Sequence, residues 1–387
     1  MSTLISTNNK LSFAHFTLVN RIPQIVEQVI NYYDLPSNSA LGLFIKSISN
    51  GPIVPIESYN SCPNQRSIYI GAINEELSAN NYSWDNAPFL FLENYLYHKL
   101  AELAFKDEIK GDYFANTKNA AVDNSMPTML ATYSEYNNIC KLPKLKSLPL
   151  LLQLNLMGNK ADLSQSTDTY SQKQQHHILI NKSQNIVDQL PNLKQVDIIL
   201  DNSGEELFAD LLLAHCLLTT ANTKKVVLHF KTMPYFVSDA QISDYDYLIN
   251  SLKRNSGLSQ FASEIEMLVN NNKLILTNDE FWSSGLLFRE MPKALSQELS
   301  KSDLLVFKGD LNYRKLVDDR MWDCLTPTDD LINYLPTDAL ILRVLKSEVI
   351  VGLKEKDIPS KEDNQWKYNG EYSIIDFVKV NTDNNSE

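Results

Sequence analysis

The chain has 387 residues, 43% hydrophobic and 21% charged, which is long enough for one large or two medium globular domains. Its 35 basic and 47 acidic residues give a net charge of −12, which argues against binding to nucleic acid or to an anionic membrane surface. The first ten residues are polar and no apolar run reaches membrane-spanning length, so we expect a cytoplasmic protein with no membrane segment. The four cysteines form no CxxC pair, so neither a zinc knuckle nor a disulfide framework is indicated.

The first 150 residues are predicted to form a helical domain. Pro23 lies in the first turn of a predicted amphipathic helix over residues 21–30. A second helix is predicted over residues 84–105, because apolar side chains recur there at spacings of three and four.

From residue 177 onward, short apolar runs alternate with amphipathic segments. Buried strands are predicted at residues 196–200, 226–230, 274–277, 304–307 and 340–345. Helices are predicted at residues 206–218, 244–255, 257–270 and 292–301. This alternation predicts an α/β fold whose mostly parallel sheet is covered by helices on both faces. The pair Asn369-Gly370 lies between aromatic and β-branched residues and predicts a hairpin that adds an antiparallel edge.

Asp201 and Asn202 directly follow the first of these strands, and Ser203-Gly204 separates them from the next helix. Open α/β sheets bind their ligands at the carboxyl ends of the strands. A carboxylate and an amide oxygen at such a position suit a divalent cation that also holds a phosphate. The same residues also suit capping of the following helix, and the local pattern taken alone favours that structural role.

Polar residues also follow other strands of the predicted sheet. The candidates after the second and fourth strands and on the fifth are Asp239, Lys308, Asp310, Arg314, Arg343 and Lys346. Because the carboxyl ends of parallel strands meet at one edge, these side chains could converge with Asp201 on a cation-and-phosphate site. Asn159 and Asp162 follow an apolar run and suit either a turn or a site. No nucleotide-binding glycine loop, zinc-protease motif or serine-hydrolase motif is present.

Two segments, LDNSGEEL at residues 200–207 and FKGDLNYRKL at residues 307–316, resemble the damage-control phosphatase family. The resemblance is to its acidic residue methyltransferase-like branch, and Gly158-Asn159 with Asp162 is similar to the family's glycine–asparagine motif. The resemblance implies a helical domain over residues 1–150 and a three-layer α/β/α Rossmann-like domain over residues 151–387. It also implies a phosphatase that depends on Mn, Co, Ni or Mg and acts on a small phosphorylated metabolite. The expected substrates are sugar phosphates such as fructose 1-phosphate and fructose 6-phosphate.

The same resemblance assigns roles to individual residues. Asp201, Asn202 and Asp239 match metal ligands, and the first two also match substrate contacts. The remaining positions that match substrate contacts are Asp310, Leu311, Asn312, Tyr313, Arg314 and Lys346. Lys346 ends the segment RVLK, which is similar to the branch's arginine–threonine–any–lysine signature with Val344 in place of threonine. The candidates for supporting roles are Asn159, Asp162, Glu206, Lys308 and Arg343.

One of the two metal-binding carboxylates, Asp201 or Asp239, is the candidate general base, and Lys346 with Lys308 or Arg314 would stabilise the phosphoryl charge. Arg21 and Lys118 are candidate contributions from the helical domain.

Two other functions stay open. In the first, Glu206 matches a position assigned to S-adenosylmethionine in a protein carboxyl methyltransferase, although the sequence has no glycine-rich cofactor loop. The second is a non-catalytic sugar-phosphate-binding module, which would be expected to have lost its metal-binding acids.

Overall fold

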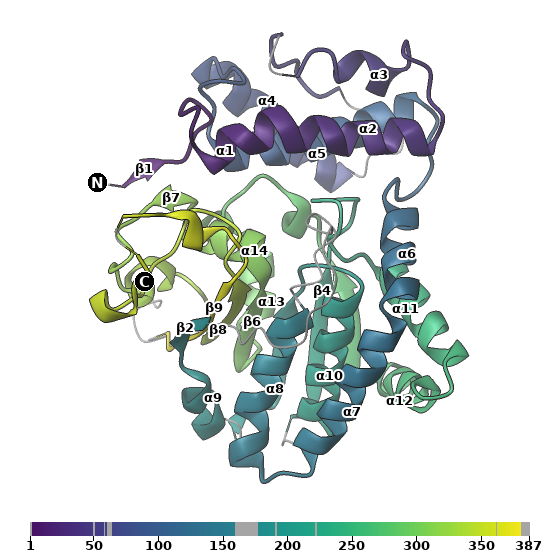
Figure 1. Cartoon of the computed structure of the whole chain (residues 1–387), viewed down its shortest axis with the longest axis vertical. Helices are drawn as coiled ribbons and strands as arrows, with labels where there is room; N and C mark the ends of the chain where they lie inside the picture. The colour runs from purple at the N-terminus through teal and green to yellow at the C-terminus, as the bar shows by residue number, and fades with distance from the viewer. Residues whose placement is uncertain are drawn as a thin grey trace.

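The computed structural model describes residues 2–48, 51–57, 59, 64–158, 177–189, 192–220, 223–360 and 362–380. A layer of amino-terminal helices lies across one end of a larger α/β unit (Figure 1). The helical layer contains α1 (Phe13–Phe16), the π-helix η1 (Thr17–Arg21), α2 (Ile22–Tyr32), α3 (Ala40–Phe44), α4 (Asn64–Asn80) and α5 (Phe89–Lys106). None of the helices in the described ranges is long and apolar enough to cross a membrane.

Both helices predicted in the amino-terminal part are present. Pro23 lies in the first turn of α2, and the apolar positions Leu18, Ile22 and Val26 recur every four residues and are buried. The helix predicted from residue 84 begins later, at Phe89, because Pro88 occupies the N-cap position. Nearly the whole surface of α5 is buried, so this helix is the centre of the amino-terminal core.

The sheet has seven strands in the order β2-β9-β8-β6-β3-β4-β5. Their bounds are β2 (His177–Asn181), β3 (Gln195–Ile199), β4 (Lys225–Phe230), β5 (Leu274–Asn278), β6 (Leu304–Lys308), β8 (Ala339–Val344) and β9 (Tyr372–Val378). All neighbours are parallel except β8 and β9. The predicted α/β class and the five predicted strands are therefore confirmed, whereas β2 was not predicted.

The hairpin predicted around Asn369-Gly370 is wrong. The residues before this turn form a short 3-10 helix, η7 (Gln365–Lys367), that buries Trp366, so they do not pair with the strand that follows. That strand, β9, is antiparallel as expected, but its antiparallel partner is β8. It is not an edge strand either, because β2 pairs with its other side.

Helices cover both faces of the sheet. Their bounds are α6 (Ala115–Asn124), α7 (Met126–Cys140), α8 (Lys144–Gly158), α9 (Ser183–Gln189), α10 (Glu205–Thr220), α11 (Ile242–Arg254), α12 (Ser259–Asn270), α13 (Lys293–Leu299), α14 (Gly309–Leu316) and α15 (Thr328–Ile332). Further 3-10 helices are η4 (Glu280–Ser283), η5 (Phe288–Glu290) and η6 (Glu355–Asp357), and a two-stranded sheet pairs β1 (Thr3–Leu4) with β7 (Arg320–Met321). The helices predicted at 206–218, 244–255, 257–270 and 292–301 correspond to α10 to α13.

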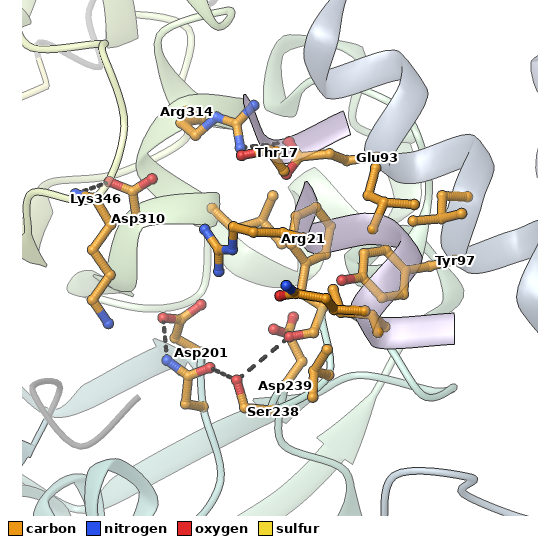
Figure 2. Close-up of a pocket in the computed structure, with 18 of the residues that line it drawn as sticks. Thr17, Arg21, Glu93, Tyr97, Asp201, Ser238, Asp239, Asp310, Arg314 and Lys346 are labelled. Atoms are coloured by element: carbon orange, nitrogen blue, oxygen red, sulfur yellow. Dashed lines mark hydrogen bonds and ion pairs between the residues drawn. The ribbon is translucent and has the colours of Figure 1, made fainter. Parts of the chain in front are cut away.

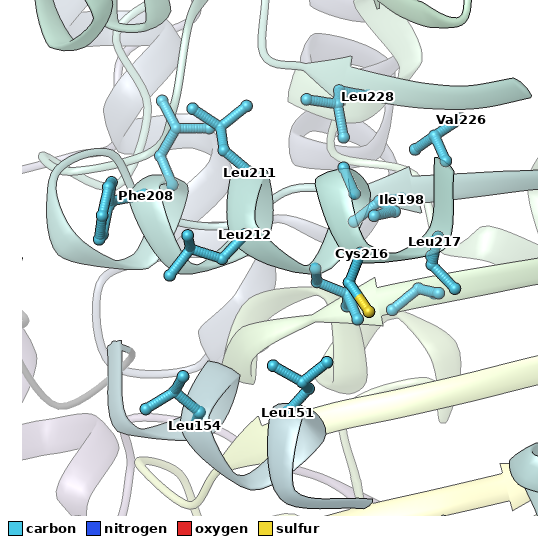
Figure 3. Packing of buried hydrophobic residues seen from close by; sticks show 14 of the residues in the cluster. Leu151, Leu154, Ile198, Phe208, Leu211, Leu212, Cys216, Leu217, Val226 and Leu228 are labelled. Carbon is cyan, nitrogen blue, oxygen red and sulfur yellow. The ribbon is translucent and has the colours of Figure 1, made fainter. Parts of the chain in front are cut away.

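Strand β3 shows how the two faces are divided. Val196 and Ile198 join a core with α8 and α10, whereas Ile199 joins the core on the opposite face. Figure 3 shows Ile198 in the first of these cores, with side chains of α8 and α10. Helices α7 and α8 pack against α10, and α6 packs against α11. Residue 150, the predicted domain boundary, lies inside α8.

Candidate active site

The site begins where β3 ends. Asn202 and Asp239 form an antiparallel bridge, which places the loop after β4 beside the loop after β3. Around the bridge, the Ala240 amide donates to the Asp201 carbonyl at 2.8 Å, and the Ser203 amide donates to the Ser238 carbonyl at 2.8 Å. Backbone hydrogen bonds thus bring together the three residues that the sequence predicts as metal ligands.

The side chain of Asn202 is held in a fixed orientation. Its Nδ2 donates to Oδ2 of Asp201 and to Oε2 of Glu206, each at 2.9 Å. The Ser238 hydroxyl donates to Oδ1 of Asn202 at 2.6 Å (Figure 2). An amide oxygen has two lone pairs, so Oδ1 keeps one acceptor position beyond the bond from Ser238. Helix α10 begins at Glu205, so its N-cap position is occupied by Gly204 and not by Asp201 or Asn202, for which the local sequence pattern favoured capping.

Asp201 also lies against the start of α14. Gly309 has φ +81°, and a Cβ built on it would lie 1.8 Å from Oδ2 of Asp201. Only glycine accommodates both this backbone conformation and this close approach. The glycine of the KGD segment is therefore required by the position of the Asp201 carboxylate.

A cavity of about 330 Å³ lies between the carboxyl ends of the strands and the amino-terminal helices. The sheet side contributes Asp201, Asn202, Phe236, Val237, Ser238, Asp239, Asp310, Leu311, Arg314 and Lys346. The helical side contributes Phe13, Thr17, Arg21, Ile22, Gln24, Ile25, Gln28, Glu93, Leu96 and Tyr97, and α6 adds Thr117. Figure 2 shows acidic and cationic side chains from both sides directed toward the same space.

Lys346 is positioned through Asp310. One carboxylate oxygen of Asp310 accepts from Nε of Arg343 at 2.7 Å and from the backbone amide of Lys346 at 3.0 Å. Burial acts to raise the pKa of Asp310, but the charges of Arg343 and Arg314 outweigh it and lower the pKa. Asp310 therefore stays ionised and fixes the backbone from which the Lys346 ammonium extends.

Asp201 lies in a surplus of negative charge. Burial raises its pKa well above the usual range, and the charges of Glu206 and Asp239 raise it further against the opposing effect of Lys346 and Lys231. A bound cation would relieve this repulsion, so the local electrostatics fit a metal. Asp239 is 2% exposed, and its Oδ2 lies 3.5 Å from Nζ of Lys231.

Several predicted residues are close to the site but do not line the cavity. The Asn312 amide donates to the carbonyls of Leu200 and Lys308, at 3.0 and 2.7 Å, and so joins β3, β6 and α14. The Tyr313 hydroxyl accepts from the Val351 amide at 2.9 Å. The predicted substrate contacts of these two side chains do not match this placement, because both point into the core.

The buried cations Lys308 and Arg343 also lie behind the cavity wall. Lys308 lies 3.2 Å from Asp210 and 3.4 Å from Glu206, so it compensates buried carboxylates and does not line the cavity. Glu206 does not line the cavity, but it accepts from the Asn202 amide and its charge acts on Asp201. Asn159 and Asp162 lie outside the described residues.

Of the other cations, Arg314 lines the cavity but is already bound to two carboxylates. It contacts Asp319 at 2.8 Å and Glu93 at 2.7 Å. Lys118 does not line the cavity. It is buried, pairs with Asp244 at 2.6 Å, and donates to the carbonyl of Asp239 at 3.3 Å.

Residues 17–360 match the family model of the damage-control phosphatase ARMT1-like domain. The chain belongs to this family. It is 30% identical over 426 residues to damage-control phosphatase ARMT1 of Macaca fascicularis, covering 95% of this chain and 96% of that protein. It is 29% identical to the Homo sapiens protein of the same name, with the same coverage of both chains. A solved DUF89 family protein from Pyrococcus horikoshii is 15% identical, with a TM-score of 0.48 and coverage of 95% and 98%.

The predicted resemblance to damage-control phosphatases is thus confirmed, and membership of the ARMT1-like family supports a phosphatase of metabolite repair. Within this ARMT1-like chain, sequence reasoning missed the cavity residues Thr17, Gln24 and Gln28. Their spacing from Arg21 is three, four or seven residues, which places all four on one helix face. That pattern was visible in the sequence, but nothing in the sequence indicated what the face contacts.

Proposed function

We propose that this ARMT1-like chain is a divalent-metal-dependent phosphatase that hydrolyses phosphate monoesters of sugars, with fructose 1-phosphate and fructose 6-phosphate as the leading substrates. The observation that supports this function best is the convergence of Asp201, Asn202 and Asp239 with Lys346 on one cavity. The cavity volume of about 330 Å³ lies near the lower end of ligand pockets, which span about 300–1,000 Å³. It therefore suits a small phosphorylated metabolite.

The donor set fits a hard or intermediate cation such as Mg, Mn, Co or Ni. Two carboxylates and one amide oxygen, without a thiolate, are typical of such ions and leave positions for substrate and water. Over the described part of the chain, no three His, Cys, Asp or Glu side chains form a metal site by themselves. In the proposed site the third protein ligand is the amide oxygen of Asn202, which keeps one acceptor position beyond the bond from Ser238. When bound, the ion neutralises phosphoryl oxygens and makes water a better nucleophile.

The protein groups stabilise the phosphoryl charge and accept the proton of the attacking water. The Lys346 ammonium pairs with phosphoryl oxygens whose charge must be stabilised in the transition state. The amino end of α14, where Asp310 and Leu311 line the cavity, adds a positive helix-dipole potential to the same region. Asp201 or Asp239 accepts the proton of the attacking water, since these are the two carboxylates of the proposed metal site.

The test is a phosphatase screen against sugar phosphates with each of the four metals, beside a chelated control. We expect activity that chelation abolishes, and a loss of about 100-fold or more in Asp201→Ala. Asp188→Ala removes an exposed acid on α9 and should keep wild-type activity. Metal-dependent activity retained by Asp201→Ala would refute the site assignment. Phosphate binding without turnover would favour a binding module, and methyl transfer from S-adenosylmethionine without phosphate release would favour a methyltransferase.

A further inference from the structure

The cavity is covered by an unusual helical turn. Residues Thr17–Arg21 form the π-helix η1, which joins α1 to α2. Such turns are rare and occur frequently at functional sites. Within η1, Leu18 is buried in the amino-terminal core, whereas Thr17 and Arg21 line the cavity. One side of the turn therefore holds it in place and the other faces the site.

The buried hydroxyl of Thr17 indicates that the cavity holds a ligand. Thr17 is 5% exposed, and its Oγ1 has no hydrogen-bond partner among the residues that the structure describes. A buried hydroxyl left without a partner costs about 1–3 kcal/mol, so such groups are uncommon unless something else binds them. Thr17 lines the cavity, which makes a molecule bound there the candidate partner of this hydroxyl.

Arg21 adds a cation to the same wall. Figure 2 shows its guanidinium extending toward the space between Asp201, Asp310 and Lys346. Its Cζ lies 5.9 Å from the ring centroid of Phe13, a cation–π contact that steadies the side chain. A guanidinium binds phosphate through two parallel hydrogen bonds, which an ammonium cannot do.

The other arginines near this space are bound to carboxylates of the protein. Arg314 also lines the cavity, but its guanidinium is engaged by Glu93 and Asp319. Arg343 is bound to Asp310 behind the wall. Lys346 approaches from the sheet side, so a phosphate above Asp201 has a partner on the opposite side only if the helical layer supplies one.

We propose that η1 is a substrate-binding element, in which Arg21 binds the phosphoryl group opposite Lys346 and the Thr17 hydroxyl hydrogen-bonds to the same molecule. The inference rests on the proposed phosphatase function and extends its site to the helical layer. Both halves of the chain then have to be in place before a phosphate ester is fully bound.

The test measures binding of inorganic phosphate to the Mn²⁺-loaded protein by calorimetry, beside sugar-phosphate kinetics. Arg21→Ala should weaken phosphate binding about 10- to 100-fold, since a hydrogen bond to a charged group is worth about 1.5–3 kcal/mol. The phosphate affinity of Arg21→Lys should lie between those of the wild type and Arg21→Ala, because lysine keeps the charge but loses the bidentate geometry. The control Arg254→Ala removes an exposed arginine of α11 and should bind phosphate as the wild type does.

Thr17→Val distinguishes a role of the Thr17 hydroxyl in ligand binding from a role in stability. It keeps the shape and removes the hydroxyl, so KM should rise several-fold while the Tm stays unchanged or increases. Wild-type phosphate affinity and KM in both Arg21→Ala and Thr17→Val would overturn the inference. So would a parallel loss of Mn²⁺ affinity in Arg21→Ala, which would assign Arg21 a purely structural role. Failure of the wild type itself to bind phosphate or to turn over sugar phosphates would instead refute the proposed function.

Discussion

Replacement of Gly309 tests the position of Asp201 directly. An L-residue at φ +81° costs about 1–2 kcal/mol. The added Cβ would lie 1.8 Å from Oδ2 of Asp201, and real Cβ contacts do not fall below 3.0 Å, so the carboxylate would have to move by more than about 1 Å. A misplacement of this size typically lowers the rate about 100-fold. We therefore expect Gly309→Ala to lower kcat/KM by about 100-fold or more.

The matched control is Gly111→Ala. Gly111 has φ +76°, and a Cβ there would meet nothing within 4 Å, so this variant carries the backbone strain without the clash. Gly111→Ala should lose about 1–2 kcal/mol of unfolding free energy in urea, and Gly309→Ala should lose more because it adds the clash with Asp201. Only Gly309→Ala should also lose Mn²⁺ affinity in a calorimetric titration and activity against fructose 6-phosphate. A Gly309→Ala protein that binds Mn²⁺ as tightly as the wild type would show that the metal does not depend on this position of Asp201.

Two further predictions concern buried charge. Lys308→Met leaves Glu206 and Asp210 buried without their counter-ion and should cost about 3–5 kcal/mol in urea unfolding at pH 7; a loss below about 1 kcal/mol would contradict the pairing. Burial lowers the pKa of His98 from 6.5 to about 4. Below pH 6.5 the His98 imidazole is therefore protonated in the unfolded chain but stays neutral in the folded chain. This difference in protonation lowers the free energy of unfolding by about 3 kcal/mol as the pH falls to about 4. His98→Gln should lose less stability than the wild type between pH 7 and pH 4.5, and equal losses would refute this account.

The sheet side of the site could be predicted from sequence because the order and direction of the strands decide where its residues lie. Asp201, Asp239 and Lys346 each follow a strand of one largely parallel sheet, and parallel strands end at a common edge. Short apolar runs between helices were enough to locate those strands. The bridge that brings Asn202 beside Asp239 required the structure, since it depends on how two irregular loops meet.

The FKGDLNYRKL segment shows where a motif by itself misleads. A contiguous motif predicts that all its residues contact substrate, but the segment forms helix α14. Asp310, Leu311 and Arg314 share one helical face and line the cavity. Asn312 and Tyr313 fall on the other side and hold the helix against the sheet. Helical periodicity accounts for the division once the segment is known to be a helix.

The helical side could not be assigned for a different reason. The spacing of Thr17, Arg21, Gln24 and Gln28 predicts a polar helix face, but most polar helix faces meet only water. Whether this face covers a ligand site depends on packing between residues that are far apart in the sequence. The unpartnered hydroxyl of Thr17 becomes visible only when that packing is known.

The RVLK segment explains why a valine is compatible with the family's signature. Arg343 is fully buried and binds the carboxylate of Asp310, which in turn accepts from the backbone amide of Lys346. The two charged residues of the segment are thus linked through a third residue on α14. Val344 is also fully buried, on the strand between them, and does not line the cavity. Its side chain therefore affects the packing of β8, while the position of the Lys346 backbone depends on Arg343 and Asp310.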